Sequence, residues 1–554
     1  MNIRPTLSEG DDVDSRWRTR FLFLAPLLAL LLVAAACGGD DGGGDGDDGG
    51  DGEAGQLGEI TWALPGLPDV LLVPHDWTTY SGAVMSLVEE GLLAFGDDLS
   101  LQPALAEDWE VVDPTTYVFT LREGVTFHDG TPLTAEDVVF SIEWNIDPDN
   151  ASQLAAFFGS VDTIEATAEN EVTVTLTAPD AQFIYSMAHM SGFIMKQEQL
   201  ETSGEDFGTP AVLPVGTGPY RLAEFVPDDH VTLERNEDYW GTPGAAEQIV
   251  IQEIPDSQTR LLAMQNGDID GTFDVPVSEA DQWEGLDGVT LITAPSNGVY
   301  QLILDYETPP FDDPNVREAI ALAVDRDGIV QAVLNGNGSP ALTINPPGIW
   351  GGVLDEGTVM DFYGTVPTYQ FDLDAARQAL AASSVPNGFE FSVPVPNNDP
   401  VAINSFLAIA ETLGQLDITM NVRQVDPGEW LDVYFAHEEG LGAQFMAYFP
   451  DYADPANYPY LFYYSENAAA NGLNGSNYRN DAVDAAIETA LESTDAAERA
   501  QALQDAIAQA QEDVATVPIH WPDSAMAISD DLRLDGYNAF WYNIPWATRG
   551  FGPA

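Results

Sequence analysis

The sequence predicts a mixed α/β body, because segments with strand periodicity and segments with helix periodicity alternate along the chain. Hydrophobic residues make up 45% of the 554 residues and aromatic residues 10%, which is typical of chains that bury cores. A chain of this length exceeds what one hydrophobic core usually supports. We therefore expect more than one globular part.

Strands are predicted where apolar side chains occupy every second position, because such a segment can bury one face. Three short segments show this alternation: Tyr117, Phe119 and Leu121; Val172, Val174 and Leu176; and Tyr300, Leu302 and Leu304.

Helices are predicted where capping residues precede apolar positions one turn apart. Thr134 begins the sequence TAED, which is typical of a capping box, and Val138 and Ile142 follow it. Asp313 and Pro314 are typical of an N-cap and a first helical position. The helix that they begin is expected to bury Val316, Ile320, Ala323 and Val324. Two more apolar stripes, joined around residues 493–495, consist of Val483, Ile487 and Leu491 and of Leu503, Ile507 and Val514.

The charge of the chain excludes some classes of partner. Asp and Glu number 91 against 17 Lys and Arg, which gives a formal net charge of −74, and Lys196 is the one lysine. Nucleic acid is a poor partner, because neutralising phosphates requires clustered Lys and Arg. The acidity agrees either with a salt-rich extracellular setting or with general amino-acid usage in the source organism.

The amino terminus has the features of a secretion signal. Arg16, Arg18 and Arg20 precede an apolar run over residues 21–36, which is short for a membrane span and ends in small residues. Residues 33–38, with the sequence VAAACG, resemble a bacterial lipobox, in which the cysteine is lipidated and becomes the new first residue. Ala34 stands where leucine is commonest, so an unlipidated secreted form stays open.

Cys37 is the single cysteine, which excludes intramolecular disulfides and cysteine-based metal sites. We expect residues 1–36 to be a signal peptide and residues 37–58, rich in Gly and acids, to be a flexible tether from lipidated Cys37. No later segment has 18 uninterrupted apolar residues, so we expect the body to be soluble.

Catalytic patterns are missing from the sequence. It contains neither a G-x-S-x-G nucleophile elbow nor a G-x-x-x-x-G-K-[ST] phosphate loop. His437 and Glu438 begin like a zinc-protease motif, but Leu441 occupies the place of the second histidine, and the six histidines are scattered. We therefore predict no enzyme activity, no metal and no cofactor.

Several segments resemble one protein family. Residues 105–109 read LAEDW and residues 117–138 read YVFTLREGVTFHDGTPLTAEDV, which is similar to the signature of the bacterial extracellular solute-binding proteins of family 5. Further similar segments are residues 214–220, 233–240, 260–270 and 310–326. We expect Gly216 and Gly218 to let the backbone turn. Asp305 and the pair Ser383 and Ser384 depart from the family pattern, near segments whose loops could touch ligand.

The resemblance implies a two-lobed, periplasmic-binding-protein-like α/β fold of the large type, with a ligand cleft between the lobes. Lobe I is expected over residues 59–95, 212–305 and 518–554, an inserted β-rich domain over residues 96–211, and lobe II over residues 306–517.

The resemblance also implies candidate ligand-binding residues. Residues 447–455, AYFPDYADP, look like a family stretch whose first aspartate binds the ligand's α-ammonium group in peptide-binding members, which here is Asp451. Tyr452 lies beside it, and Trp430 and Tyr448 align with aromatic positions that line side-chain pockets. His437 and Phe445 stand where oligopeptide binders carry arginines, so peptide cargo is an open question.

The expected function is that of the substrate-binding component of an ABC importer, which closes its lobes over a short peptide outside the cell membrane. Expected partners are the permease and ATPase subunits and the membrane, reached through Cys37, and the protein is expected to be a monomer. Two alternatives stay open: the same role with an oligosaccharide or glycoside, a cationic small molecule or a nickel complex as cargo, or an enzyme or signalling ectodomain on this fold.

Overall fold

The computed structural model describes residues 57–437, 440–538, 540–548 and 550–554, which belong to one compact unit. The predicted signal peptide, Cys37 and most of the predicted tether lie outside the described residues. The first strand, β1 (Leu57–Leu64), begins earlier than expected, because Leu57 already pairs with Ala246. Leu57 and Gly58 therefore belong to the sheet and not to the tether.

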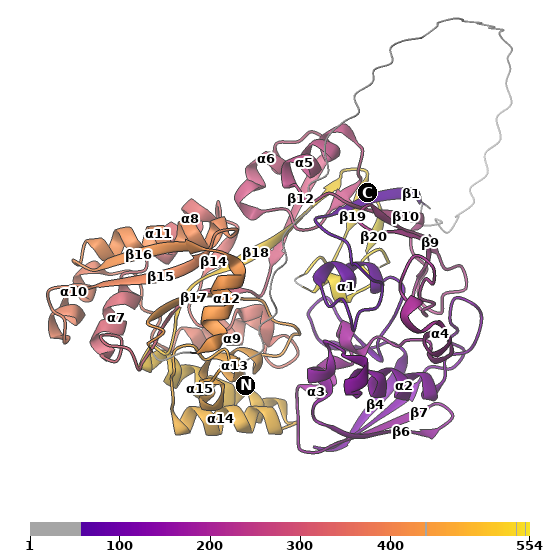
Figure 1. The fold of residues 1–554 in the computed structure, drawn as a ribbon, viewed down its shortest axis with the longest axis horizontal. Coiled ribbons are helices and arrows are strands. Elements are labelled where there is room, and N and C mark those ends of the chain that lie inside the picture. Colours follow the sequence, from indigo (N-terminus) through magenta and orange to yellow (C-terminus); the bar gives the residue numbers. More distant parts are fainter. Residues whose placement is uncertain (1–56, 438–439, 539, 549) are drawn as a thin grey trace, which may run out of the picture. The chain divides into compact units, whose positions relative to one another are not determined.

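The largest sheet is mixed and runs through much of the described chain (Figure 1). Its strands, in spatial order, are β17 (Ala443–Tyr448), β13 (Val299–Leu304), β18 (Val517–Ser529), β11 (Gly271–Thr272), β1, β10 (Ala246–Glu253), β9 (His230–Arg235) and β8 (Tyr220–Val226). β12 (Val289–Pro295) and β14 (Gly338–Pro340) also pair with β18.

β18 joins two parts of this sheet. Residues 517–522 of the strand pair with β13 and β14, whereas residues 523–529 pair with β12. Residues 296–298 connect β12 to β13. Because Pro295 pairs with Asp523 and Tyr300 pairs with His520, this connection crosses between the two parts beside the middle of β18.

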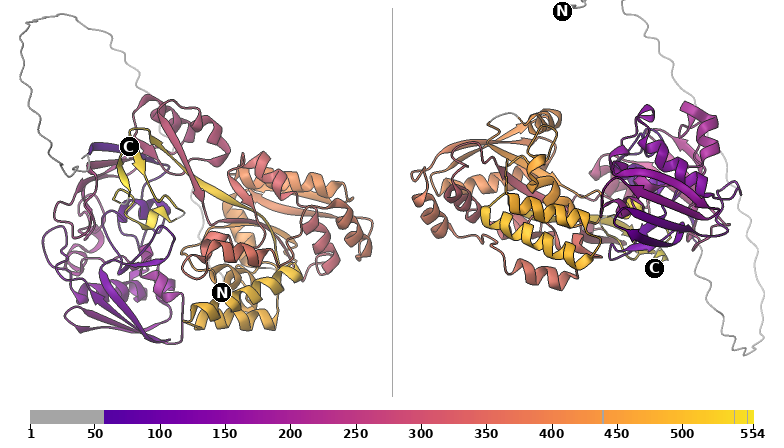
Figure 2. Two further views of the ribbon diagram at one scale, coloured as in Figure 1. Left: turned by 180° about the vertical axis from the view of Figure 1, so that it is seen from behind. Right: turned by 90° about the horizontal axis from the view of Figure 1, so that it is seen from below.

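A separate antiparallel sheet lies between β1 and β8 in the sequence, and Figure 2 shows it in purple. Its strands are β4 (Ala106–Asp113), β5 (Thr116–Leu121), β7 (Glu171–Leu176) and β6 (Val161–Ala168), and α2 (Ala135–Ile146) shares their core. Alternate residues of β5 and β7 are buried, as predicted. The capping box of α2 is confirmed: the Asp137 N–H donates to Thr134 Oγ1 over 3.3 Å, and the Thr134 N–H donates to Asp137 Oδ2 over 3.0 Å.

The part of the chain after β13 contains a parallel pair, β15 (Glu390–Pro396) and β16 (Thr419–Val425), which shares a core with several helices. Among these helices are α7 (Pro314–Leu322), α8 (Arg326–Val333) and α11 (Pro400–Gly414). Asp313 caps α7 as predicted, but α7 ends at Leu322, so Ala323 and Val324 are buried beyond the helix. The helix stops there because Asp325 caps α8 by accepting from the Gly328 N–H.

The remaining helices and strands complete the described part of the chain. The helices are α1 (Thr79–Met85), α3 (Phe183–Ser186), α4 (Gln197–Ser203), α5 (Ser257–Asn266), α6 (Ala280–Glu284), α9 (Glu356–Tyr363), α10 (Leu373–Ala382), α12 (Pro427–Ala436), α13 (Asn457–Tyr463), α14 (Asp481–Glu492) and α15 (Ala496–Asp513). The strands are β2 (Leu93–Phe95), β3 (Leu101–Pro103), β19 (Leu532–Leu534) and β20 (Phe551–Pro553). The two predicted C-terminal stripes lie on α14 and α15, and Val514 caps the end of α15.

Gly216 and Gly218 lie where two backbone segments approach each other closely. The chain bends over residues 217–219, but neither glycine has a positive φ. A Cβ on Gly216 would lie 1.9 Å from the Val88 carbonyl oxygen, and one on Gly218 would lie 2.6 Å from that of Leu87. Close approach of two backbone segments therefore selects glycine at both positions.

Within the described ranges, no helix combines the length and the apolar character needed to cross a membrane.

Candidate ligand-binding site

The loop between β17 and α13 carries Asp451 and is fixed at its far end by Asp454. Asp454 Oδ1 accepts from the Ala456 N–H over 2.7 Å, and Asp454 Oδ2 pairs with Arg499 Nη2 at 2.5 Å. Both side chains of this pair are buried. The loop is therefore anchored to α15 by an acid whose hydrogen-bonding capacity is used within the fold.

Asp451 lies in the same loop and lines a cavity of about 560 Å³. The lining is drawn from two stretches far apart in the sequence, Trp77 to Ser186 and Asp451 to Leu491. It includes Trp77, Phe157, Asp180, Tyr452, Tyr460 and Leu491 and contains no Lys, Arg or His. The walls are thus aromatic and apolar, with carboxylates as the charged groups.

Four tyrosines lie near the Asp451 carboxylate: Tyr448, Tyr452, Tyr458 and Tyr542. Burial raises the pKa of each phenol, and the negative charge of Asp451 raises it further. Their hydroxyls therefore stay protonated and can act as donors. Tyr542 belongs to the C-terminal segment, whereas the other three tyrosines lie between residues 448 and 458. Distant segments of the sequence therefore surround Asp451.

Asp451 has no cationic partner in the described part of the chain. Burial raises the pKa of its carboxyl group from 3.8 to about 6, and the nearby Tyr448 hydroxyl limits that rise. A desolvated carboxylate without a counter-ion is costly, and a positively charged ligand would relieve this cost. The site is therefore suited to a ligand that carries an ammonium or another cationic group.

Tyr452 extends the cavity with an aromatic surface. Its ring stacks on Tyr185 with centroids 6.2 Å apart, and its edge meets Phe157 at 5.9 Å. Both partners precede β8 in the sequence, so Tyr452 bridges the two stretches that line the cavity. Flat, rigid side chains of this kind offer contact area at small entropic cost.

The other aromatic candidates occupy different environments. The Tyr448 O–H donates to Asn457 Oδ1 over 2.5 Å, and the ring lies edge-on to that of Tyr458. Tyr448 is not among the residues that line the cavity. Trp430 lies on α12 and donates Nε1–H to the Phe445 carbonyl over 3.2 Å. Phe445 is 1% exposed and packs against Tyr300 and other rings in the core. The structure thus brings Asp451 and Tyr452 together at the cavity, whereas Trp430 and Phe445 do not line it.

His437 also lies apart from this cavity, at the C-terminal end of α12 with φ 50°. Its Nε2 lies 2.9 Å from Asn477 Oδ1, and Asn477 Nδ2 donates to Asp305 Oδ1 over 2.9 Å. The buried Asp305 therefore holds His437 through Asn477. Asp305, which departs from the family pattern, thus has a structural role. The Ser384 N–H donates to Asp313 Oδ2, a backbone contact that does not depend on the serine side chain.

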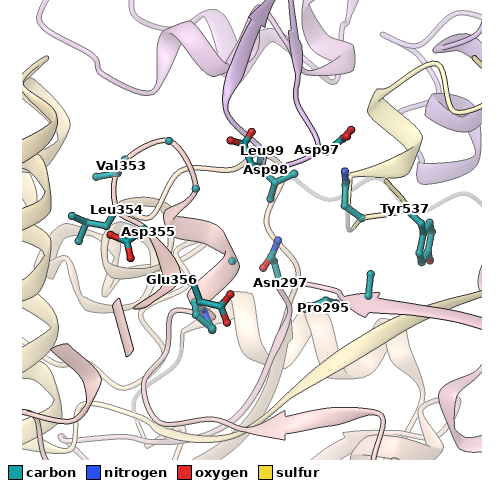
Figure 3. A pocket seen from close by; sticks show the side chains of 16 residues that line it. Asp97, Asp98, Leu99, Pro295, Asn297, Val353, Leu354, Asp355, Glu356 and Tyr537 are labelled. Carbon is teal, nitrogen blue, oxygen red and sulfur yellow. The ribbon is translucent and has the colours of Figure 1, made fainter. Parts of the chain in front are cut away.

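A second cavity of about 670 Å³ lies beside the β12–β13 connection (Figure 3). Asp97 and Asp98 line one side, Asp355 and Glu356 the other, and Asn297 lies between them. The Asn297 carbonyl accepts a short hydrogen bond from Tyr458, which connects this cavity to the tyrosines around Asp451. Asn297 Oδ1 is buried without a hydrogen-bond partner in the described structure.

Sequence reasoning missed the residues of this second cavity and the aromatic residues Trp77, Phe157 and Phe183, which line the cavity beside Asp451. The acids at positions 97, 98, 355 and 356 are members of a set of 91, and no motif distinguishes them. The aromatic residues carry no spacing signal because tertiary contacts alone bring them to the cavity.

Comparison with known proteins identifies the family. The family model described as "Bacterial extracellular solute-binding proteins, family 5 Middle" matches residues 100–470. The chain belongs to this family.

Members of family 5 resemble the chain over most of its length. The glutathione-binding protein GsiB of Escherichia coli strain K12 is 29% identical over 454 residues, which is 79% of this chain and 85% of that protein. The periplasmic binding protein DppA of Helicobacter pylori, solved with the peptide STSA, has a TM-score of 0.72 and 23% identity and covers 90% of this chain and 99% of its own. NikZ of Campylobacter jejuni, solved with Ni(L-His), has a TM-score of 0.69 and 21% identity, with 86% and 94% covered.

These similarities confirm the predicted fold class, an α/β two-lobed binding-protein fold. As a family 5 member, the chain is an extracellular solute-binding protein, and its relatives are binding proteins rather than enzymes.

Proposed function

We propose that this chain is the substrate-binding component of an ABC importer and that it captures short peptides by their ammonium end. The observation that carries the proposal is the Asp451 carboxylate, which faces a cavity, is desolvated and has no cationic partner in the described residues. A peptide ammonium would supply the missing charge and donate a charge-assisted hydrogen bond to the carboxylate. The peptide- and glutathione-binding relatives support this cargo.

The proposal includes the arrangement of the chain. Lobe I comprises residues 59–95, 212–305 and 518–554, residues 96–211 form an inserted domain, and lobe II comprises residues 306–517. The crossings at residues 296–298 and at the middle of β18 support a hinge that lies a few residues inside the proposed boundaries at 305 and 518, because few connections would have to bend during closure. Cys37 would carry the lipid anchor at the outer face of the membrane, and a permease and an ATPase would take the ligand from the monomeric binding protein. We propose no catalytic step.

A cationic small molecule is the second candidate cargo, and the cavity lining favours it. Asp180 and Asp451 both line the 560 Å³ cavity, and no basic side chain is among the lining residues. A peptide's free carboxylate would therefore find no positive partner there. A ligand with a positive charge and no carboxylate matches the lining better.

Calorimetry with three forms of one tetrapeptide separates these possibilities. The free peptide, its C-terminal amide and its N-acetylated form should be titrated into the mature chain. Under the first proposal the free and amidated peptides bind and the acetylated peptide does not. Under the second proposal, either the amidated peptide alone binds or none of the three peptides binds. In that case mass spectrometry of the ligand copurified from the native source would show a non-peptide cation.

The Asp451→Asn variant tests the residue itself. We expect it to lower affinity at least 10-fold, since removing one partner of a desolvated charge pair typically costs 2 kcal/mol or more, which is a factor of about 30. The matched control is Asp268→Asn, because Asp268 is exposed and lines neither cavity. Equal affinity of the Asp451→Asn variant and the control would refute the proposal.

A further inference from the structure

A third cavity, of about 460 Å³, lies outside the candidate site and shares no lining residue with the two cavities described above. Its walls come from the segment after α1, from β2 and β3, and from residues 239–242 and 543–550. Apolar and aromatic side chains cover most of it, among them Leu93, Pro103, Phe193 and Trp240. Two adjacent acids, Glu89 and Glu90, also line it.

The Glu90 carboxylate forms hydrogen bonds with three neighbouring side chains. Its carboxylate accepts from Thr217 Oγ1 at 2.8 Å, from the Tyr239 hydroxyl at 2.7 Å and from Trp240 Nε1 at 2.9 Å. Burial raises the pKa of Glu90, and these three hydrogen bonds and the charge of Arg122 limit the rise, so that the pKa is about 7. Glu90 therefore needs no further partner.

Glu89 is equally buried but has no such partner. Its side chain is 3% exposed, and the described structure contains neither a hydrogen bond nor an ion pair to its carboxylate. Burial alone raises its pKa to about 8. Buried carboxyl groups without partners are uncommon in folded proteins and call for an explanation.

Two further polar groups at this cavity are unpartnered. Asn543 is 4% exposed, and although its Oδ1 accepts from the Met190 N–H over 2.9 Å, its Nδ2 donates to nothing in the described part of the chain. Ser86 is 1% exposed, and its Oγ has no partner there either. Both atoms are enclosed by protein, so the Glu89 carboxylate is the group of these three that is left to meet an occupant of the cavity.

Neither a metal ion nor a basic side chain of the described chain is suited to pair with Glu89. Metal ions need several oxygen or nitrogen ligands, and no group of three His, Cys, Asp or Glu able to hold a metal occurs among the described residues. Arg122, the cation near Glu90, lies over the Trp240 ring at 4.5 Å and donates Nε–H to the Ala104 carbonyl, so it is engaged elsewhere. The lining residues themselves include no Lys, Arg or His.

We propose that this cavity is a second ligand site for a small organic cation, whose ammonium group binds the Glu89 carboxylate. The aliphatic and aromatic walls accept the apolar remainder of such a molecule. The site is independent of the proposed peptide cleft and of the identity of the transported cargo.

L-Leucinamide is a suitable probe, because it carries an ammonium group, a carbonyl oxygen and an apolar side chain. It should be titrated by calorimetry into the mature chain with Asp451→Asn, so that binding at the candidate cleft is weakened. We expect one binding event that N-acetyl-L-leucinamide, which lacks the positive charge, does not reproduce. Absence of any binding would overturn the proposal.

Two variants in the same background locate the event. Glu89→Gln should weaken binding at least 10-fold, and Ala94→Trp should abolish it by filling the cavity from its half-buried wall. Unchanged affinity in either variant would overturn the proposal. Thermal denaturation checks folding. Without probe, Glu89→Gln should melt no lower than its parent, since glutamine has nearly the same size as the carboxyl group that burial keeps mostly protonated near neutral pH. The variant should lose the increase in melting temperature that leucinamide gives the parent.

Discussion

Arg499 Nη2 lies 2.5 Å from Asp454 Oδ2, and both side chains are almost completely withdrawn from solvent. Asp451, in the same loop, lies beside a cavity without any such partner among the described residues. The two acids are three residues apart in the sequence, and they have different structural roles. One fixes the loop to α15, and the other presents a charge that the fold does not neutralise.

Asp454→Asn should destabilise the protein and leave the chemistry of the cavity intact. The substitution strands the buried guanidinium of Arg499, and breaking a buried pair from one side typically costs about 3–5 kcal/mol. Chemical denaturation of the variant and the parent measures the difference. A loss below about 1 kcal/mol would show that the loop does not depend on this pair.

Asp451→Asn should have the opposite effect on stability, and the effect should depend on pH. Burial raises the folded-state pKa to about 6 from an ordinary value of 3.8, so the folded form resists ionisation while the unfolded form does not. Stability contributed by this group is therefore present below about pH 4 and is lost as the pH rises to about 6. At pH 7.5 the variant should be more stable by about 2 kcal/mol, after allowance for partial exposure, and at pH 3.8 the two should be nearly equal.

The same titration predicts how binding varies with pH. A cationic ligand requires ionised Asp451, so its affinity should fall as the pH drops through 6. Calorimetry of an amidated peptide at pH 5 and pH 7.5 measures this change, and the Asp451→Asn variant should lose it. A parent protein whose affinity is the same at both values would contradict the assignment.

Gly216→Ala should be strongly destabilising, because the new Cβ would lie 1.9 Å from the Val88 carbonyl oxygen and a backbone atom cannot move aside cheaply. Gly414→Ala is the matched control: it lies at the end of α11 with nothing within 4 Å of its Cβ position. There alanine should be neutral or should stabilise by up to about 1 kcal/mol. Thermal denaturation of the two variants distinguishes close packing from backbone turning.

Local sequence signals predicted what local physics determines. The alternation in β5 and β7 and the Thr134 capping box depend on neighbours within a few residues, and both are present as predicted. The predicted end of α7 is too late. The apolar positions continue through Ala323 and Val324, but α7 ends at Leu322 because Asp325 caps a new helix.

The candidate site was predictable only in part. Asp451 is one of 91 acids, and the resemblance to a family motif, not its chemistry, distinguished it in the sequence. Its environment depends on Phe157, Tyr185 and Tyr542, which tertiary structure brings to it from distant segments. The unpartnered Glu89 has no sequence signal, because the burial that makes it unusual is a property of the folded chain.

Thr134→Ala should cost about 1 kcal/mol of stability, since the first turn of α2 would lose the acceptor for the Asp137 N–H. Thr134→Ser keeps a hydroxyl and serves as the control, with a loss of a few tenths of a kcal/mol at most. Denaturant titration of the two variants is sufficient. Equal stability of both would mean that the packing of α2, and not its cap, determines where the helix begins.

Phe445 and Tyr452 provide the sharpest contrast between core and site. Phe445→Ala removes a ring that is 1% exposed and packed among Tyr300, Phe406 and Trp430, so it should cost about 3–5 kcal/mol of stability. Ligand affinity, measured well below the melting temperature, should stay within about threefold. Tyr452→Ala removes part of the cavity wall and should lower affinity about 10-fold with a smaller loss of stability. The reverse result, in which Phe445→Ala abolishes binding by a folded protein and Tyr452→Ala does not, would place the ligand against β17 and α12 and away from the Asp451 cavity.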